Sequence, residues 1–301
     1  MNVGIDCVTE GSPFEMGSAQ GESLRQKIHS SPDVLAQLYG FRMLQPPWMP
    51  YALYRWISEN RATRFLEDSL KRDFPEAHLR MKGISEQSQI RMGLLYLLHA
   101  LEPMLCNVSR CAIVPAFAAC SAVAVRGRRS ATREPVIARN FDYLPLVQPL
   151  YTLRESRPRS GFRSLDFTIA PSAGTVDGLN EKGLCITYDY AYVSDFSGRG
   201  TAPISIVIAE ALQRCATVIE AADWISSRPR WGGGILMLLD TDQLARIMSD
   251  HQSGGMPGDT SICKHSDYWN TTATLQLFPV SRRMRVAFDS ACRAKYKEFG
   301  L

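Results

Sequence analysis

At about residue 120 the pattern of apolar residues changes, and the change divides the chain into two parts. Before it, apolar residues recur at helical spacing with charged residues between them, as over Tyr51–Leu70 and Ser85–Leu101. After it, short apolar or alternating runs predominate, and such runs are typical of strands. The sequence therefore predicts an α+β protein in which a helical first part precedes antiparallel sheets that helices cover.

The second part contains nine short segments that we expect to be strands. A turn over residues 180–183 is expected to join the fourth and fifth of them, because Gly183 tolerates a positive φ. One long helix is expected over Pro203–Ser226, and another is expected to start at Ser31, because the proline that follows it favours a first turn. The expected strands are Ser121–Val125, Pro135–Phe141, Leu165–Ala170, Thr175–Leu179, Leu184–Tyr190, Ile235–Asp240, Leu244–Met248, Thr272–Phe278 and Met284–Phe288.

Composition excludes several classes of function. A net charge of +4 over 301 residues is too mild to indicate binding to nucleic acid. The basic clusters at 126–129, 154–163 and 281–283 are interpreted as solvated loop faces, with an anionic ligand such as coenzyme A near 154–163 as the less favoured alternative. No secretory signal and no apolar run of about eighteen residues is present, so we expect a cytoplasmic protein without a membrane partner. The oligomeric state is left open.

The eight cysteines form neither a C-x-x-C pair nor a zinc pattern. We therefore expect reduced thiols, most of them small buried hydrophobes, and neither a metal nor a cofactor. Cys120 has a different setting: Ala118 and Ala119 precede it and an apolar strand follows. About twenty residues later the next strand ends on Arg139 and Asp142. A thiol at the start of one strand, facing a charged pair on the next, is typical of N-terminal-nucleophile amidohydrolases.

Four segments, taken in order, give the chain from Cys120 onward a resemblance to a known family. They are Cys120 with Arg139-x-x-Asp142, then Gly178–Leu184, then Ser249–His251 with Ser261–His265, and last Thr271–Ala273 with Met284–Val286. The chain resembles the acyl-coenzyme A:6-aminopenicillanic acid acyltransferase family and, more distantly, choloylglycine hydrolases and acid-ceramidase-like amidases. The resemblance implies the four-layer αββα sandwich of N-terminal-nucleophile hydrolases. It also implies that a helical segment, 1–119, and a sheet-rich catalytic segment, 120–301, form one domain.

The resemblance assigns a role to four residues. Self-cleavage before Cys120 would free its α-amino group to act as base for its own thiol, while Asp142 would hold that amino group and Arg139 would polarise the thiol. Asn180 would contribute to an oxyanion hole. The alternatives are a buried thiol, an ion pair at a strand end and a turn asparagine. Residues three apart in a regular strand face opposite ways, so Arg139 and Asp142 share one site only if the strand bends or ends nearby.

The chain departs from the family in one segment. A second oxyanion asparagine, expected in a Thr-Asn-His stretch, is missing, and Asp250, His251 and Asn270 are the nearest polar substitutes. The implied activity is hydrolysis of an amide, or acyl transfer from a thioester, of a small molecule, with a coenzyme A thioester as one possible substrate. The alternatives are a binding protein that has lost catalysis, and a hydrolase that pairs Cys120 with His251 or His265.

Overall fold

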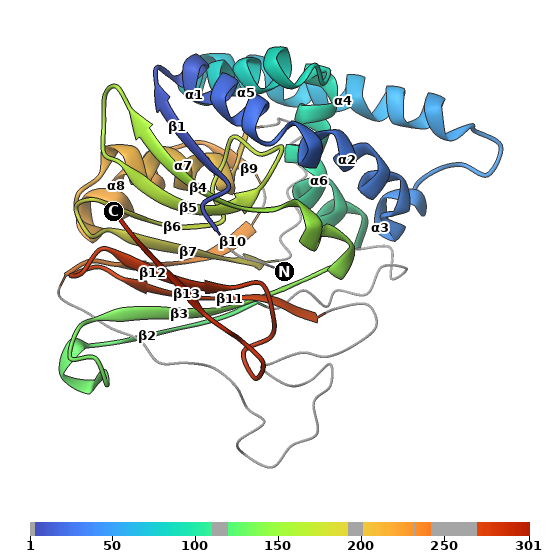
Figure 1. Ribbon diagram of the computed structural model, residues 1–301. Helices are drawn as coiled ribbons and strands as arrows, with labels where there is room; N and C mark the ends of the chain where they lie inside the picture. The colour runs from blue at the N-terminus through green and yellow to red at the C-terminus, as the bar shows by residue number, and fades with distance from the viewer. Residues whose placement is uncertain (1–3, 110–119, 192–200, 232, 242–269) are drawn as a thin grey trace.

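Two β-sheets stacked face to face form the centre of the protein (Figure 1). The computed structural model describes residues 4–109, 120–191, 201–231, 233–241 and 270–301. The first sheet contains, in spatial order, β1 (Cys7–Gly11), β4 (Tyr151–Pro158), β5 (Ser164–Ile169), β6 (Asp177–Asn180), β7 (Cys185–Ala191) and β10 (Gly233–Leu239). The second contains β13 (Lys297–Gly300), β12 (Arg283–Ala287), β11 (Asn270–Phe278), β3 (Val136–Tyr143) and β2 (Ser121–Val125). Within these two sheets, neighbouring strands are antiparallel except β1 and β4, which run parallel. A separate parallel pair is formed by β8 (Ala202–Pro203) and β9 (Arg230–Trp231).

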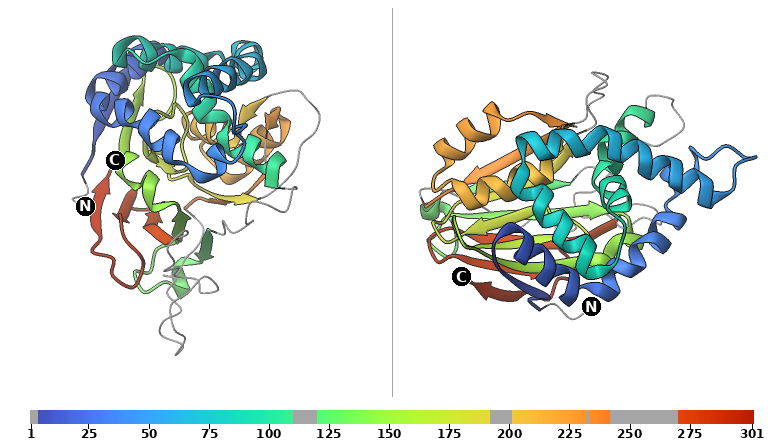
Figure 2. Two further views of the ribbon diagram at one scale, coloured as in Figure 1. Left: turned by 90° about the vertical axis from the view of Figure 1, so that its right-hand side faces the viewer. Right: turned by 90° about the horizontal axis from the view of Figure 1, so that it is seen from above.

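Helices cover the outer face of the first sheet (Figures 1 and 2). Helix α1 packs on β1 and β4, while α7 packs on β6 and β7. The expected α+β class is therefore confirmed, with three layers formed by the described residues; these place no helix over the outer face of the second sheet. The helices are α1 (Pro13–Ser23), α2 (Arg25–Gln37), α3 (Tyr39–Arg42), α4 (Tyr51–Asp73), α5 (Pro75–Ser88), α6 (Met92–Ser109), α7 (Ile204–Arg214) and α8 (Val218–Ser227).

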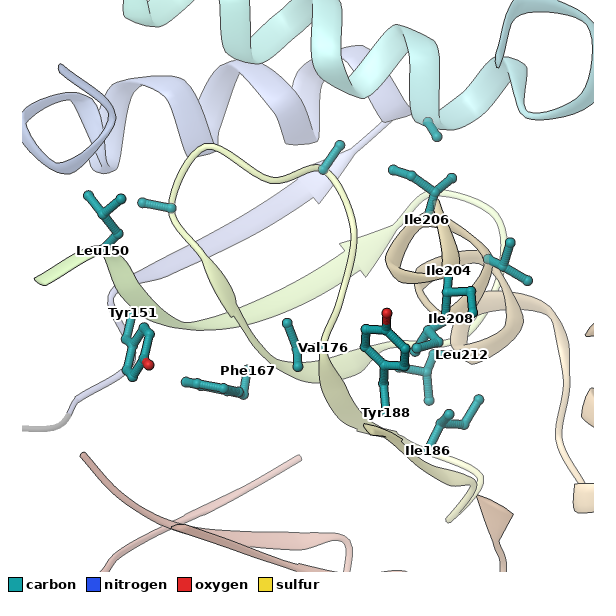
Figure 3. Close-up of a cluster of buried hydrophobic side chains, with 14 of the residues drawn as sticks. Leu150, Tyr151, Phe167, Val176, Ile186, Tyr188, Ile204, Ile206, Ile208 and Leu212 are labelled. Atoms are coloured by element: carbon teal, nitrogen blue, oxygen red, sulfur yellow. The ribbon is translucent and has the colours of Figure 1, made fainter. Parts of the chain in front are cut away.

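Two apolar layers hold this arrangement together. Between the sheets, the ring of Phe167 in β5 lies edge-on to Phe141 in β3 and to Tyr151 in β4, with ring centres 5.3 Å apart in both pairs. Between the first sheet and the helices, α7 is buried along its length and packs on β7 near Ile186 and Tyr188 (Figure 3). Because apolar side chains leave water on both faces, the first sheet is buried on both sides.

Helices α1 and α5 approach so closely that glycine is required at their contact. Gly17 in α1 faces the backbone carbonyl of Arg80, and Gly83 in α5 faces the carbonyl of Phe14. A methyl group at either position would overlap backbone atoms of the other helix. The contact places α5 firmly against α1, which in turn packs on β1.

The Gly17→Ala variant is therefore expected to lose about 2 kcal/mol of unfolding free energy, because backbone cannot move aside as a flexible side chain can. Urea unfolding followed by circular dichroism measures this loss. Gly4→Ala is the matched control, since no atom lies within 4 Å of the position that its methyl group would occupy. Equal stability of the two variants would contradict the close contact.

The described strands and helices agree with most expectations and correct several. Residues 85–101 are not one helix, because α5 ends at Ser88 and Gln89 takes a left-handed conformation with φ 61°. Pro32 lies inside α2 rather than at a helix start. The helix expected over 203–226 is interrupted, and Thr217 caps α8. Strands β1, β4 and β13 were not expected, and the strand predicted at 244–248 lies outside the described residues.

The interpretation of residues 154–163 as a solvated loop is wrong for residues 154–158, which belong to β4. Arg154 lies in β4 with no exposed surface. Its guanidinium donates to Asp166 Oδ2 at 3.2 Å, to Gln20 Oε1 at 3.0 Å and to the Gly174 carbonyl at 3.0 Å. Arg154 therefore links α1 to the first sheet, on the side of that sheet that faces the helices. Arg157 and Arg163 are partly exposed.

None of the helices in the described part of the chain is both long enough and apolar enough to cross a bilayer.

Candidate active site

Cys120 immediately precedes β2 and lies beside the C-terminal part of β3. Ser121 pairs with Asn140, and the same register continued by one residue places Cys120 across from Phe141. The thiol is half-buried against the hydrophobic core, and its Sγ lies 3.7 Å from the Asp142 carbonyl oxygen. The expected neighbours of Cys120 are thus brought together, although the contact with Asp142 is through its backbone.

Arg139 is deeply buried, at 1% exposure. It projects from β3 into the space between the sheets, where its guanidinium stacks over Phe141 with 4.9 Å between the charge and the ring centre. It forms an ion pair with Asp177 in β6, donates to Asp189 in β7 at 3.2 Å, and donates to the Tyr188 carbonyl. Arg139 therefore links the second sheet to the first, and the alternative of an ion pair at a strand end does not describe it.

Asp142 faces away from Arg139, as their spacing along the strand requires. Its buried carboxylate accepts a hydrogen bond from the Thr271 hydroxyl on β11. The register of β11 against β3 shifts between Thr271 and Ala273, directly opposite Asp142 and Phe141. Bulges of this kind turn side chains to new directions and are common beside active sites. The irregularity therefore lies in the pairing with β11, while β3 itself continues through Tyr143, one residue beyond Asp142.

The electrostatics of this cluster keep the thiol protonated. Burial raises the pKa of Cys120 to about 12, and the opposing charge of Arg139 does not offset that effect. Burial also raises the pKa of Asp177 to about 6, although the guanidinium of Arg139 lies beside it. Burial acts to lower the pKa of Arg139, and the neighbouring Asp177, Cys120 and Asp189 hold it above the ordinary value. Cys120 therefore needs a base before it can act as a nucleophile.

An apolar cavity of about 170 Å³ adjoins the cluster. Tyr143, at the end of β3, and Tyr188, whose carbonyl accepts from Arg139, both line it. Its wall also includes Glu102 of α6, and the charge of Arg139 acts on that carboxyl as it acts on Cys120. The cavity and the thiol are thus neighbours of the same guanidinium.

Asn180 does not join the cluster. It ends β6 on the face opposite Asp177, where its amide nitrogen donates to the carbonyls of Leu212 at 2.7 Å and Cys215 at 2.8 Å. Its side-chain oxygen accepts from the backbone N–H groups of Lys182 and Leu184, both at 3.0 Å. Both amide hydrogens are committed to the end of α7, so the side chain holds the turn and the helix rather than an oxyanion. These hydrogen bonds favour the turn alternative over the expected catalytic role.

Asn180→Ala is accordingly expected to lower the unfolding free energy by about 3 kcal/mol, because two buried carbonyls and two N–H groups lose their partner. Thermal unfolding measures the loss. Lys182→Ala, on the exposed side of the same turn, is expected to cost less than about 0.5 kcal/mol. A fully stable Asn180→Ala protein would instead restore the case for a catalytic role.

Several sequence candidates lie outside the described residues: Asp250, His251 and His265, together with their flanking motifs. Asn270 is described; it begins β11 and pairs with Tyr143. The carboxylates Asp177, Asp189 and Glu102 were missed by sequence reasoning. Their signal was an acidic residue inside an otherwise apolar strand or helix, which requires a buried partner. Among the described residues, no three His, Cys, Asp or Glu side chains are grouped so that they could hold a metal ion.

Comparison with known proteins supports the resemblance. Residues 129–271 match the model of the acyl-coenzyme A:6-aminopenicillanic acid acyl-transferase family. The match covers Arg139, Asp142 and Asn180 and begins after Cys120. The family resemblance expected from the sequence is thereby confirmed. No curated protein matches the chain.

Solved structures that match include penicillin V acylase from Agrobacterium tumefaciens, at 14% identity and TM-score 0.36, covering 60% of this chain and 86% of that one. The Caenorhabditis elegans N-acylethanolamine-hydrolyzing acid amidase ortholog matches at 15% identity and TM-score 0.36, covering 60% and 99%. A mutant of the conjugated bile acid hydrolase from Clostridium perfringens matches at 16% identity and TM-score 0.26, covering 60% and 50%.

Proposed function

We propose that the protein is a self-processing cysteine amidohydrolase or acyltransferase whose acyl-enzyme forms on Cys120. The observation that carries the proposal is the position of the thiol: at the start of a strand, against the Asp142 carbonyl and within the field of a buried guanidinium. The family match supports an enzyme that transfers or hydrolyses acyl groups of small molecules. The same proposal makes residues 1–119 and 120–301 two segments of one domain.

Processing begins with attack of the Cys120 thiol on the carbonyl carbon of Ala119. The new S–C bond forms as the C–N bond to Cys120 breaks, and the departing nitrogen takes the thiol proton. Water then cleaves the resulting thioester, which releases the Ala119 carboxylate and restores the thiol. The product carries a free α-amino group on Cys120, next to Asp142.

Turnover uses that amino group as the base that the protonated thiol lacks. An α-amino group has an ordinary pKa of ~7.7–8.0, so at neutral pH it can accept the thiol proton. Asp142 would hold the resulting ammonium and Arg139 would stabilise the thiolate. The thiolate attacks the substrate carbonyl, the ammonium returns its proton to the leaving amine or thiol, and water or an amine then takes the acyl group from sulfur.

The Asn180 amide donates to the carbonyls of Leu212 and Cys215 and so does not stabilise an oxyanion. Activated acyl donors are therefore expected to react best. A thioester leaving group needs less stabilisation of the tetrahedral intermediate than an amine does. The experiment compares matched thioesters and amides with the same acyl group, using the processed protein. Turnover of thioesters at least about a hundredfold faster is the expected result. Equal turnover of the unactivated amides would show that a full oxyanion hole exists.

The loss of Asn180 as a donor also favours a second candidate, a binding protein that kept the fold without catalysis. That candidate predicts an intact chain and no turnover of either substrate type. The hydrolase that pairs Cys120 with a histidine predicts turnover by the intact chain.

A further inference from the structure

The cavity beside the Cys120 cluster is shaped for an apolar group of limited size. Its volume of about 170 Å³ is close to that of an engineered ~150 Å³ protein cavity that binds benzene. Both segments of the chain line it, with helices α2 and α6 on one side and η2 (Pro145–Leu150) and the sheets on the other; Figure 3 shows Leu150, Val176 and Tyr188 from this wall. The apolar side chains of its wall include Val34, Leu35, Leu38, Leu98, Val147 and Leu150.

The charge carried by this wall is of one sign. Glu102 lines the cavity, and no lysine or arginine is among the described residues that do so. His99 is neutral there: its Nε2 accepts from the Ala173 N–H at 3.1 Å, which leaves the proton on Nδ1, 2.7 Å from the Leu95 carbonyl. Burial keeps the pKa of His99 at about 4. A ligand therefore meets an acidic group and no basic one.

Glu102 is held in place by tyrosines. The Tyr188 hydroxyl donates to Glu102 Oε2 at 3.2 Å, and the Tyr190 hydroxyl donates to the Glu102 carbonyl at 2.8 Å. Burial raises the pKa of Glu102, and the hydrogen bond from Tyr188 and the charge of Arg139 only partly oppose it. A further cation beside this carboxyl would relieve the cost of burying its charged form.

Around Arg139 the described residues supply more negative than positive charge. The charges of Asp142 and Asp189 act on the Cys120 thiol, and the charge of Arg139 acts on the carboxyl groups of Asp177 and Glu102. Among these residues Arg139 carries the one guanidinium. Cleavage before Cys120 would add one ammonium. One guanidinium and one ammonium are still fewer than the four carboxyl groups, so a cation brought by a ligand would lower the net negative charge of the described cluster.

We propose that the cavity binds an acyl donor that carries a protonated amine, which pairs with Glu102, and an apolar group about as large as a phenyl ring. That the ligand is an acyl donor rests on the proposed function, whereas its binding through an ammonium and an apolar group does not. In a site of low dielectric, an ammonium beside a carboxylate is strongly favoured over a neutral group of the same shape. A second carboxylate would be repelled, so Glu102 selects against acidic substrates as well as for basic ones.

Binding to the full-length Cys120→Ala protein tests the proposal without any turnover. Three probes of matched size are titrated by calorimetry: 2-phenylethylammonium, 2-phenylethanol and phenylacetate. The ammonium is expected to bind about tenfold more tightly than the alcohol, and phenylacetate most weakly. Adding Glu102→Gln, which keeps the size and removes the charge, is expected to abolish the tenfold preference and leave the alcohol unchanged. Glu86→Gln, on the exposed side of α5, is the charge-matched control and is expected to change nothing.

The proposal is overturned if the alcohol or phenylacetate binds as tightly as the ammonium, if none of the three binds, or if Glu102→Gln retains the preference. Selectivity among the three probes decides the matter even if the Glu102→Gln protein fails to fold. Self-cleavage is measured separately by intact mass. Ammonium selectivity without cleavage would remove the proposed function and leave this inference standing, whereas cleavage without selectivity would remove this inference alone.

Discussion

The Cys120→Ala protein is expected to remain a single chain of 33.6 kDa with no turnover, while the unsubstituted protein separates into residues 1–119 and 120–301. Removing the sulfur removes both the group that attacks the Ala119 carbonyl and the group that would carry the acyl intermediate. Loss of a covalent nucleophile typically lowers kcat by about 10⁶-fold. Mass spectrometry of the purified proteins gives the chain masses, and sequencing of the second fragment gives its first residue.

Cys292→Ala is the matched control, because Cys292 is an exposed thiol that lies outside the cluster. It is expected to process and turn over normally. An unsubstituted protein that stays intact and still turns over substrate would refute processing as a requirement for activity. A Cys120→Ala protein that is cleaved at the same bond would refute Cys120 as the attacking group.

The sequence predicted the architecture well where one periodicity dominates. Strand β2 and helix α4 were recognisable because their apolar residues repeat at a single spacing. Strand β4 was not, because Arg154 and its neighbours look like a solvated basic cluster until the ion pair with Asp166 is known. A buried arginine is identified by its partners, and these come from distant positions that spacing along one chain does not reveal.

The candidate site shows the same limit. The sequence brought Cys120 together with Arg139 and Asp142, because two neighbouring antiparallel strands place their ends side by side. It did not reveal that Arg139 is held by Asp177 and Asp189 across the gap between two sheets. Asn180 was assigned a catalytic role from its place in a motif. Its side chain, however, leaves β6 on the side of α7 and forms its hydrogen bonds there. Facing direction depends on register, which the motif alone does not fix.

Removing the charge of Arg139 is expected to have the second-largest effect, because it lowers the unfolding free energy of the protein as well as its catalytic activity. Arg139→Met keeps much of the side-chain volume but leaves the Asp177 and Asp189 carboxylates without their partner between the sheets. Breaking one side of a buried ion pair typically costs about 3–5 kcal/mol. The burial of this pair predicts that the variant is markedly less stable as well as impaired in cleavage. Urea unfolding at neutral pH measures the difference.

A second substitution separates the two contributions. Asp177→Asn, added to Arg139→Met, removes one of the stranded charges and is expected to recover about half of the lost stability, while activity stays lost because the thiol still has no guanidinium beside it. Arg159→Met, which breaks an exposed pair with Glu15, is the control and is expected to cost less than about 1 kcal/mol. If Arg139→Met costs no more than this control, the buried pair contributes little to stability. If Asp177→Asn restores turnover as well as stability, Arg139 serves the fold and has no direct role at the thiol.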